Sequence, residues 1–258
     1  MNSHGEIYAI ILALLFAVAA GLVGSFALMK RMLLASDVIS HVALPGIGLA
    51  FLFGFNPLLG GAVTLLAGTL LIWQLQRKTG LATEAMIGVI FAASVAVGAA
   101  LTPRKDLEEA LFGRFQQLSL HAFVLGVLAV LLIIVTIYRF KDQLLLSLFS
   151  PELAAATSVR LDRLNLLFLL AFSLTVLVGL RFMGGLLAGA LVIIPATTGR
   201  RLASNVNRFL VSSCVVSVAA TGLGLLTATL ALPQFSPGPI VVIISTVFFG
   251  ISLLKKAK

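Results

Sequence analysis

The sequence DVISHVALPGIGLAFLFGFNPLLGGAVTLLAGTLLIWQLQ, residues 37–76, decides the fold of this chain. After its first residue it contains no Asp, Glu, Lys or Arg, and His41 is the only titratable side chain in that charge-free part. Asn56 and Pro57 divide the run, because this pair favours a turn. Each remaining part has the roughly 20 apolar residues that a helix needs to cross the hydrocarbon core of a membrane.

The composition of the whole chain extends this pattern. The 258 residues are 60% hydrophobic and only 10% charged, and the mean hydropathy is +1.15. A soluble domain carries about 25% charged residues, so this chain is predicted to be an integral membrane protein. The net charge of +9 reflects basic loops between apolar runs rather than nucleic-acid binding. With Cys214 as the single cysteine, neither an internal disulfide nor a thiolate metal cluster is possible.

Charge-free windows predict an all-α polytopic bundle of eight or nine transmembrane helices. The first window is expected to stay in the protein, because a cleavable signal has a shorter apolar core behind a basic start. The seventh window is short and rich in glycine. Without it the count falls to eight, and the two halves of the chain then disagree in orientation. The nine windows are 7–29, 37–55, 57–76, 84–102, 119–138, 164–181, 184–199, 209–231 and 238–254.

The basic residues orient the predicted bundle. With the N-terminus outside, 14 of the 18 Lys and Arg residues fall in cytoplasmic segments, as the positive-inside rule requires. The four exceptions are Arg104, Lys105, Arg114 and Arg181. The amphipathic loop 103–119 is then external and the loop 139–163 cytoplasmic. Within the latter, Ser150, Pro151 and Glu152 are typical of the cap, first position and first turn of a short helix.

Asp37 and His41 lie one helical turn apart, so their side chains share one face of the second predicted span. Ionisable groups at membrane depth are costly, which makes this pair a functional hypothesis. A carboxylate and an imidazole directed at one point can ligate a divalent transition metal. The structural alternative is that Asp37 caps the helix and His41 bonds to a neighbouring helix.

Two prolines are predicted to disturb their helices. Pro45 lacks an N–H and crowds the carbonyl of His41, so we expect a kink there that frees the oxygen, and Gly46 permits close backbone approach. Broken helices at membrane depth are tolerated where they line a cavity. Pro195, which frees the carbonyl of Leu191, lies in a glycine-rich stretch that either packs helices closely or lines a pathway.

Glu84 is a third candidate ligand, at the start of the fourth predicted span. All three residues lie near the same end of their respective predicted helices, so their side chains are expected to converge. Two carboxylates and one imidazole suit zinc or manganese. The alternative is an acidic residue placed in the first turn by the helix dipole. The chain has no Gly-Lys-Ser/Thr phosphate loop, so it does not bind ATP in that manner.

Several stretches resemble, in the same order, segments of the membrane permeases of zinc and manganese ABC importers, the ABC-3 family. The stretches are GSFALMKRMLLASDVISHVALPGIGLAF (24–51), ATEAMIGVIFAASVAVG (82–98), LFGRFQQLS (111–119), SPELAAATSV (150–159) and GGLLAGALVIIPATTGR (184–200). The similarity covers nearly the whole chain, and the element Asp-x-x-Ser-His-x-x-x-Pro-Gly is specific.

The resemblance implies one permease domain over residues 1–258, a homodimer that spans the prokaryotic cell (inner) membrane many times. Such permeases receive zinc or manganese from an extracytoplasmic binding protein and pass the ion by alternating access. Cytoplasmic ATP-binding subunits hydrolyse the ATP, so the chain is not itself an enzyme and holds no permanent cofactor. An alternative cargo is a metal chelate or corrinoid. An intramembrane enzyme and a purely structural membrane subunit are further alternatives.

The resemblance also assigns residues. Asp37, His41 and Glu84 are the expected metal-path residues, and Pro45, Gly46 and Pro195 the expected pathway or kink residues. Docking of the ATP-binding subunits is expected in the loop 139–163, through Pro151, Glu152, Ala155 and Ser158. The chain departs from the family pattern at Ser150, where Asp is usual, and near Ser158, where Gly is usual.

Overall fold

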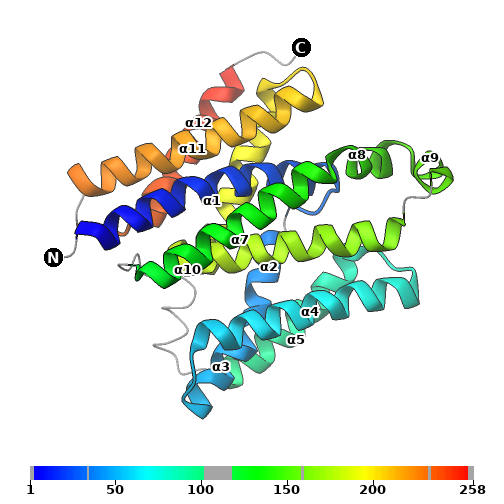
Figure 1. Ribbon diagram of the computed structural model, residues 1–258, viewed down its shortest axis with the longest axis horizontal. Helices are drawn as coiled ribbons and strands as arrows, with labels where there is room; N and C mark the ends of the chain where they lie inside the picture. Colours follow the sequence, from blue (N-terminus) through cyan, green and yellow to red (C-terminus); the bar gives the residue numbers. More distant parts are fainter. Residues whose placement is uncertain (1–2, 34, 102–117, 158–159, 232–233, 255–258) are drawn as a thin grey trace.

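The computed structural model describes residues 3–33, 35–101, 118–157, 160–231 and 234–254, and all regular structure in these ranges is helical (Figure 1). Eight of the described stretches are long and apolar enough to cross a membrane, which confirms the expected all-α bundle of eight or nine spans. The first half of the chain forms α1 (Ser3–Met29), α2 (Ala35–Ser40), the 3-10 turn η1 (His41–Ala43), α3 (Leu44–Phe53), α4 (Pro57–Thr79) and α5 (Thr83–Leu101). The second half forms α7 (Leu120–Arg139), α8 (Lys141–Phe149), α9 (Pro151–Ala156), α10 (Leu161–Leu202), α11 (Val206–Leu230) and α12 (Pro237–Leu254).

The second predicted span is broken beside Pro45. The α-helical geometry of α2 tightens into the 3-10 turn η1, and α3 then begins with Pro45 in its first turn. A proline is tolerated there because the first turn has no use for its missing N–H. The expected break is therefore present. The carbonyl oxygen of His41 is not free, however, because it accepts a hydrogen bond from the N–H of Leu44.

The turn between α3 and α4 has the predicted chemistry. Gly54 ends α3 in the left-handed region, with φ of 71°, which a glycine adopts without steric penalty. The side chain of Asn56 then caps α4 by accepting a hydrogen bond of 2.9 Å from the N–H of Leu58, and Pro57 occupies the first helical position. The Asn-Pro pair thus ends one span and starts the next within a few residues.

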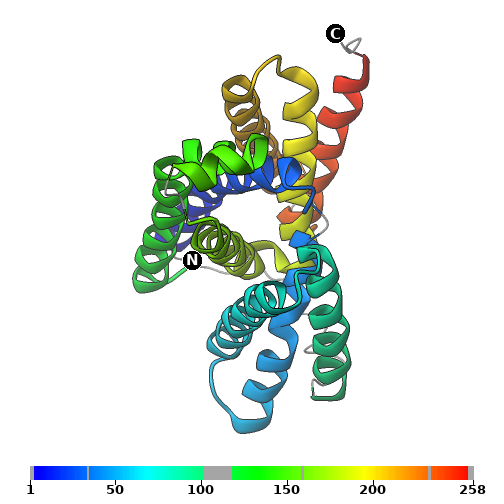
Figure 2. The same cartoon turned by 90° about the vertical axis from the view of Figure 1, so that its right-hand side faces the viewer.

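The sixth and seventh predicted spans are one helix rather than two. α10 runs over 42 residues, from Leu161 to Leu202, which corresponds to about 63 Å at 1.5 Å per residue. That is about twice the thickness of the hydrocarbon core. The two parts of α10 run in different directions (Figures 1 and 2). The prediction that one helix ends and another begins near residues 182–183 is therefore wrong. Pro195 also lies within α10 without ending it.

The helices form two packed groups. α1, α10, α11 and α12 pack against one another, and α3 packs against α4 and α5 as a separate layer (Figure 2). α10 joins the groups, because it contacts α2 and α4 as well as α1, α7, α11 and α12. Fully buried phenylalanines fill the first group: Phe16, Phe26, Phe168, Phe172 and Phe209. α10 is therefore the central element that positions both the second span and the peripheral helices.

Two glycines let α3 and α4 approach closely. A Cβ atom on Gly46 would overlap the carbonyl oxygen of Gly60, and a Cβ on Gly60 would overlap the carbonyl oxygen of Gly46. Small residues allow such backbone contact between membrane helices, where association depends on packing rather than on the hydrophobic effect. The predicted close approach at Gly46 is thus present, with Gly60 as its partner.

We expect Gly60→Val to destabilise the protein by about 1–3 kcal/mol, because the added methyl groups overlap backbone that cannot move independently. The measurement is the midpoint of thermal unfolding in detergent, followed by circular dichroism. Gly88→Ala on α5 is the matched control, since a Cβ there meets nothing within 4 Å. An unchanged midpoint for Gly60→Val would contradict the close contact.

Candidate functional site

Asp37 lies in the first turn of α2, half-buried, and α10 fixes its position. The hydroxyl of the preceding Ser36 donates to the carbonyl of Leu33 at 2.9 Å and lies 3.5 Å from the carbonyl oxygen of Gly189 on α10. A Cβ on Gly189 would lie only 3.1 Å from the Cα of Asp37, so the two backbones are nearly in contact. Because α2 begins at Ala35, Asp37 is not the helix cap of the structural alternative.

His41 opens the 3-10 turn and faces α5. Its ring packs edge-on against Phe91, with 5.4 Å between the ring centroids and 63° between the planes. The hydroxyl of Ser40, the residue before His41, donates to the backbone carbonyl of Asp37 at 2.6 Å. This bond links the backbone at the two positions. His41 is half-buried. The imidazole is therefore held by a packing contact on one side, and its ring nitrogens are left to other partners.

Asp37 and His41 have the arrangement of a binding pair without an internal partner. The Asp37 carboxylate is close enough to interact electrostatically with His41. Within the described part of the chain, neither side chain forms a hydrogen bond or an ion pair. Both side chains are half-buried, so each can still accept a further ligand. Because ionisable groups within a membrane span are usually functional, the pair favours a ligand over a structural role.

Glu84 is not part of this pair in the present conformation. It lies in the first turn of α5 and is exposed, whereas His41 meets α5 at Phe91. Phe91 follows Glu84 by seven positions, which corresponds to two turns, or about 10 Å along the helix axis. No three His, Cys, Asp or Glu residues among those described are grouped to hold one metal ion. The expected convergence of Asp37, His41 and Glu84 is therefore not found.

The break between α2 and α3 is packed against α4. The hydroxyl of Thr64 on α4 lies 3.4 Å from the carbonyl oxygen of Ala43, the last residue of η1. Pro45 and Gly46 follow directly in the first turn of α3, next to Gly60. The backbone interruption beside the acid–imidazole pair is thus supported by a neighbouring helix rather than exposed to lipid.

Pro195 is buried in the second part of α10. The hydroxyls of Thr197 and Thr198 both donate at 2.8 Å to the carbonyl of Ile194, just before the proline. These hydroxyls bond to a carbonyl beside the proline and not to that of Leu191, which is the carbonyl that loses its N–H partner to Pro195.

The predicted docking segment forms two short helices, α8 and α9. α9 begins at Pro151, with exposed Glu152 in its first turn, as expected. The side chain of Ser150 forms no capping hydrogen bond, so that part of the expectation is wrong. Ala155 lies in α9, whereas Ser158 falls outside the described residues. Residues 103–117 of the predicted external loop also fall outside them.

A polar network joins three helix ends and was not predicted from the sequence. The amine of Lys30, just after α1, donates to Asn165 Oδ1 on α10 at 3.1 Å and lies 5.0 Å from the ring centroid of Phe168. The amide of Asn165 donates to Gln76 Oε1 on α4 at 2.9 Å. Burial lowers the pKa of Lys30 to about 8. The charge-free windows gave no indication of which helix ends meet.

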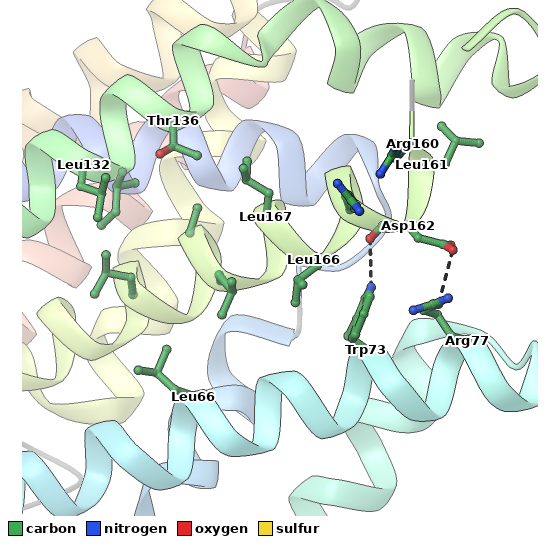
Figure 3. Close-up of a pocket in the computed structure, with 15 residues that line it drawn as sticks. Leu66, Trp73, Arg77, Leu132, Thr136, Arg160, Leu161, Asp162, Leu166 and Leu167 are labelled. Carbon is green, nitrogen blue, oxygen red and sulfur yellow. Dashed lines mark hydrogen bonds and ion pairs between the residues drawn. The ribbon is translucent and has the colours of Figure 1, made fainter. Parts of the chain in front are cut away.

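A second set of contacts joins α4 to the start of α10 (Figure 3). The indole N–H of Trp73 donates to the carbonyl oxygen of Asp162 at 2.9 Å. The guanidinium of Arg77 pairs with the Asp162 carboxylate at 3.3 Å and lies 4.8 Å from the Trp73 ring centroid. Both partners of the ion pair are more than half exposed, so it contributes at most about 1 kcal/mol.

The fold and the site define a polytopic membrane protein with an acid–imidazole pair beside a broken span. The chain belongs to the ABC 3 transport family, which it matches over residues 6–256. It is 30% identical to the manganese import system permease protein ScaB of Streptococcus parasanguinis, over 95% of this chain and 88% of that protein. It is 28% identical to the high-affinity zinc uptake system membrane protein ZnuB of Haemophilus influenzae, over 91% of each.

A solved structure is also similar. PsaBC from Streptococcus pneumoniae, in complex with Fab, contains a chain that matches with a TM-score of 0.82 and 26% identity. The match covers 98% of this chain and 92% of that chain. The multi-span architecture is thus shared over nearly the full length of both chains.

We expect the stability of the folded protein to rise as the pH rises from about 8 toward 10.5, through Lys30. Its folded pKa is lowered to about 8 from 10.5, so between these values the unfolded chain binds the proton that the folded chain has released. The measurement is thermal unfolding in detergent from pH 7.5 to 10.

Lys30→Met should remove this increase, because no titratable group remains at that position. Lys78→Met, at an exposed lysine of the last turn of α4, is the matched control for loss of charge. Identical pH profiles for the wild type and Lys30→Met would contradict the assignment.

Proposed function

We propose that this chain is the membrane permease of an ATP-driven importer of manganese or zinc, and that Asp37 and His41 bind the ion as it crosses. One observation carries the proposal: two half-buried ionisable side chains lie one turn apart at a helix break, without polar partners in the described part of the chain. A cation between them would satisfy both groups at once.

The ligand chemistry supports a transition metal. Carboxylate oxygen and imidazole nitrogen suit both manganese and zinc. The similar ScaB protein is named for manganese import and the similar ZnuB protein for zinc uptake. Two protein ligands leave the other coordination positions to water or to groups that change during transport. Such incomplete coordination favours transport, because an ion that is bound too tightly does not leave.

Glu84 is assigned a separate position on the same path. It stands exposed at the beginning of α5, two turns from the contact between Phe91 and His41. The distribution of basic residues puts this end of α5 at the cytoplasmic side. A carboxylate there would attract the ion after it leaves Asp37 and His41, before it reaches the cytoplasm.

The energy for transport would come from partner subunits. The chain contains no phosphate-binding loop of the Gly-Lys-Ser/Thr type. The short helices α8 and α9 connect α7 to α10, and the exposed Glu152 of α9 is available for contact. We assign docking of the ATP-binding subunits to this segment. An extracytoplasmic binding protein would deliver the ion to the permease. Two copies of the chain would form the complete path and work by alternating access.

We expect Asp37→Asn and His41→Gln each to lower metal-dependent uptake more than about tenfold, since loss of even an outer ligand contact commonly weakens metal binding by that factor. The measurement is uptake of manganese and zinc by cells that express the complete transporter. Protein amounts in the membrane serve as the control. Unchanged uptake in both variants would rule out a role for the pair. If bare manganese or zinc ions did not compete for uptake, the result would support a metal chelate as the cargo.

Glu84→Gln should separate binding from passage. Because Glu84 lies about two turns along α5 from Phe91, the residue that His41 contacts, its replacement should leave equilibrium binding of manganese or zinc within about twofold of the wild type. Uptake should nevertheless fall, because the exit carboxylate is lost. Binding is measured by calorimetry on the purified transporter, with Asp37→Asn as the comparison variant. An equal loss of binding in the two variants would instead make Glu84 a direct ligand.

A further inference from the structure

A large groove lies between α4, α7 and the first part of α10, away from the acid–imidazole pair (Figure 3). Its volume is about 1210 Å³. Its sides are largely apolar and include six of the seven leucines that line it: Leu66, Leu132, Leu166, Leu167, Leu170 and Leu174. Leu132 on α7 is 60% exposed, so the groove opens outward from the helix bundle. A wall of this kind is suited to a hydrocarbon chain.

One end of the groove is cationic. Arg77, Arg160 and Arg163 line it, together with the single carboxylate of Asp162. That carboxylate pairs with Arg77 at 3.3 Å. Arg160 and Arg163 are exposed and form no hydrogen bond or ion pair within the described ranges. This end of the groove therefore has two guanidinium groups available for an anion.

The two ends together have the polarity of a membrane lipid. A basic cluster between transmembrane helices on the cytoplasmic side is a recognised site for anionic headgroups, and the basic segments of this chain are predicted to be cytoplasmic. Trp73 lies at the boundary between the leucines and the arginines, a level at which tryptophan is enriched in membrane proteins. The groove is therefore aligned with one leaflet of the bilayer.

The charge of the groove favours lipid over a second copy of the chain. A second copy would bring the same arginines or another apolar surface to the cationic end. An anionic lipid supplies both a phosphate for Arg160 and Arg163 and an acyl chain for the leucines.

We propose that the groove between α4, α7 and α10 is a binding site for an anionic phospholipid, with its phosphate at Arg160 and Arg163 and an acyl chain along the leucines. The site is independent of the metal path. Its occupant would bridge α4, α7 and α10, and two of these, α4 and α7, bury only 33% and 17% of their most apolar windows within the protein.

Trp73 provides a direct test, because it is the only tryptophan of the chain and lines the groove. The full chain is purified in an uncharged detergent and titrated with phosphatidylglycerol that carries brominated acyl chains, which quench tryptophan on contact. Phosphatidylcholine with the same brominated chains is titrated in parallel. We expect phosphatidylglycerol to quench at a concentration at least about tenfold lower, since each arginine strengthens binding of an anionic lipid about fivefold.

Replacing both Arg160 and Arg163 with Ala should weaken quenching by phosphatidylglycerol about twentyfold and leave phosphatidylcholine unaffected. Both side chains are exposed, so the fold should be retained. Replacing both with Lys should keep most of the preference. Lys78→Ala is the matched control, because it removes a neighbouring charge that does not line the groove. Equal quenching by the two lipids would overturn the proposal. Absence of quenching by both lipids would also overturn it, because it would mean that protein covers the groove.

Discussion

A chain in the hydrocarbon core has no water to satisfy its backbone, so every interruption of a helix there must find partners within the protein. Two carbonyl groups at the break in the second span meet this constraint. The carbonyl of His41 accepts a hydrogen bond from the N–H of Leu44, and the Thr64 hydroxyl of α4 lies close to the carbonyl of Ala43. Because the backbone is satisfied, the side chains of the break are left for another purpose. Asp37 and His41 can therefore remain without internal partners at the position where a transported ion would be expected.

The same constraint explains why the break is surrounded by glycine. Backbone groups can be supported by a neighbouring helix only if that helix comes close, and close approach requires the absence of Cβ atoms. Gly46 and Gly60 bring α3 against α4, and Gly189 brings α10 against Asp37. The site is thus held by contacts between backbones, which are stiffer than contacts between long side chains. A stiff surround suits a pair of ligands that must keep one separation.

α10 connects this site to the rest of the molecule. Its second part supports Asp37 through Gly189, and its first part carries Asn165 and Asp162, which join α10 to α1 and α4. The first part also forms the floor of the leucine-lined groove. Because one helix takes part in all three features, a movement of α10 would alter the surroundings of Asp37, the polar network and the leucine-lined groove.

The sequence by itself determined the class of fold, most span limits, the break at Pro45 and the turn at Asn56. These depend on local properties, namely hydrophobic length and the restricted backbones of Pro, Gly and Asn. Only the tertiary structure decided that α10 is one helix, that His41 meets α5 two turns away from Glu84, and that Lys30 meets Asn165. Such facts depend on the length of each helix and on how neighbouring helices are positioned along their axes. The spacing of residues within one helix cannot fix the position of its neighbour, because that position is set by contacts between residues far apart in the chain.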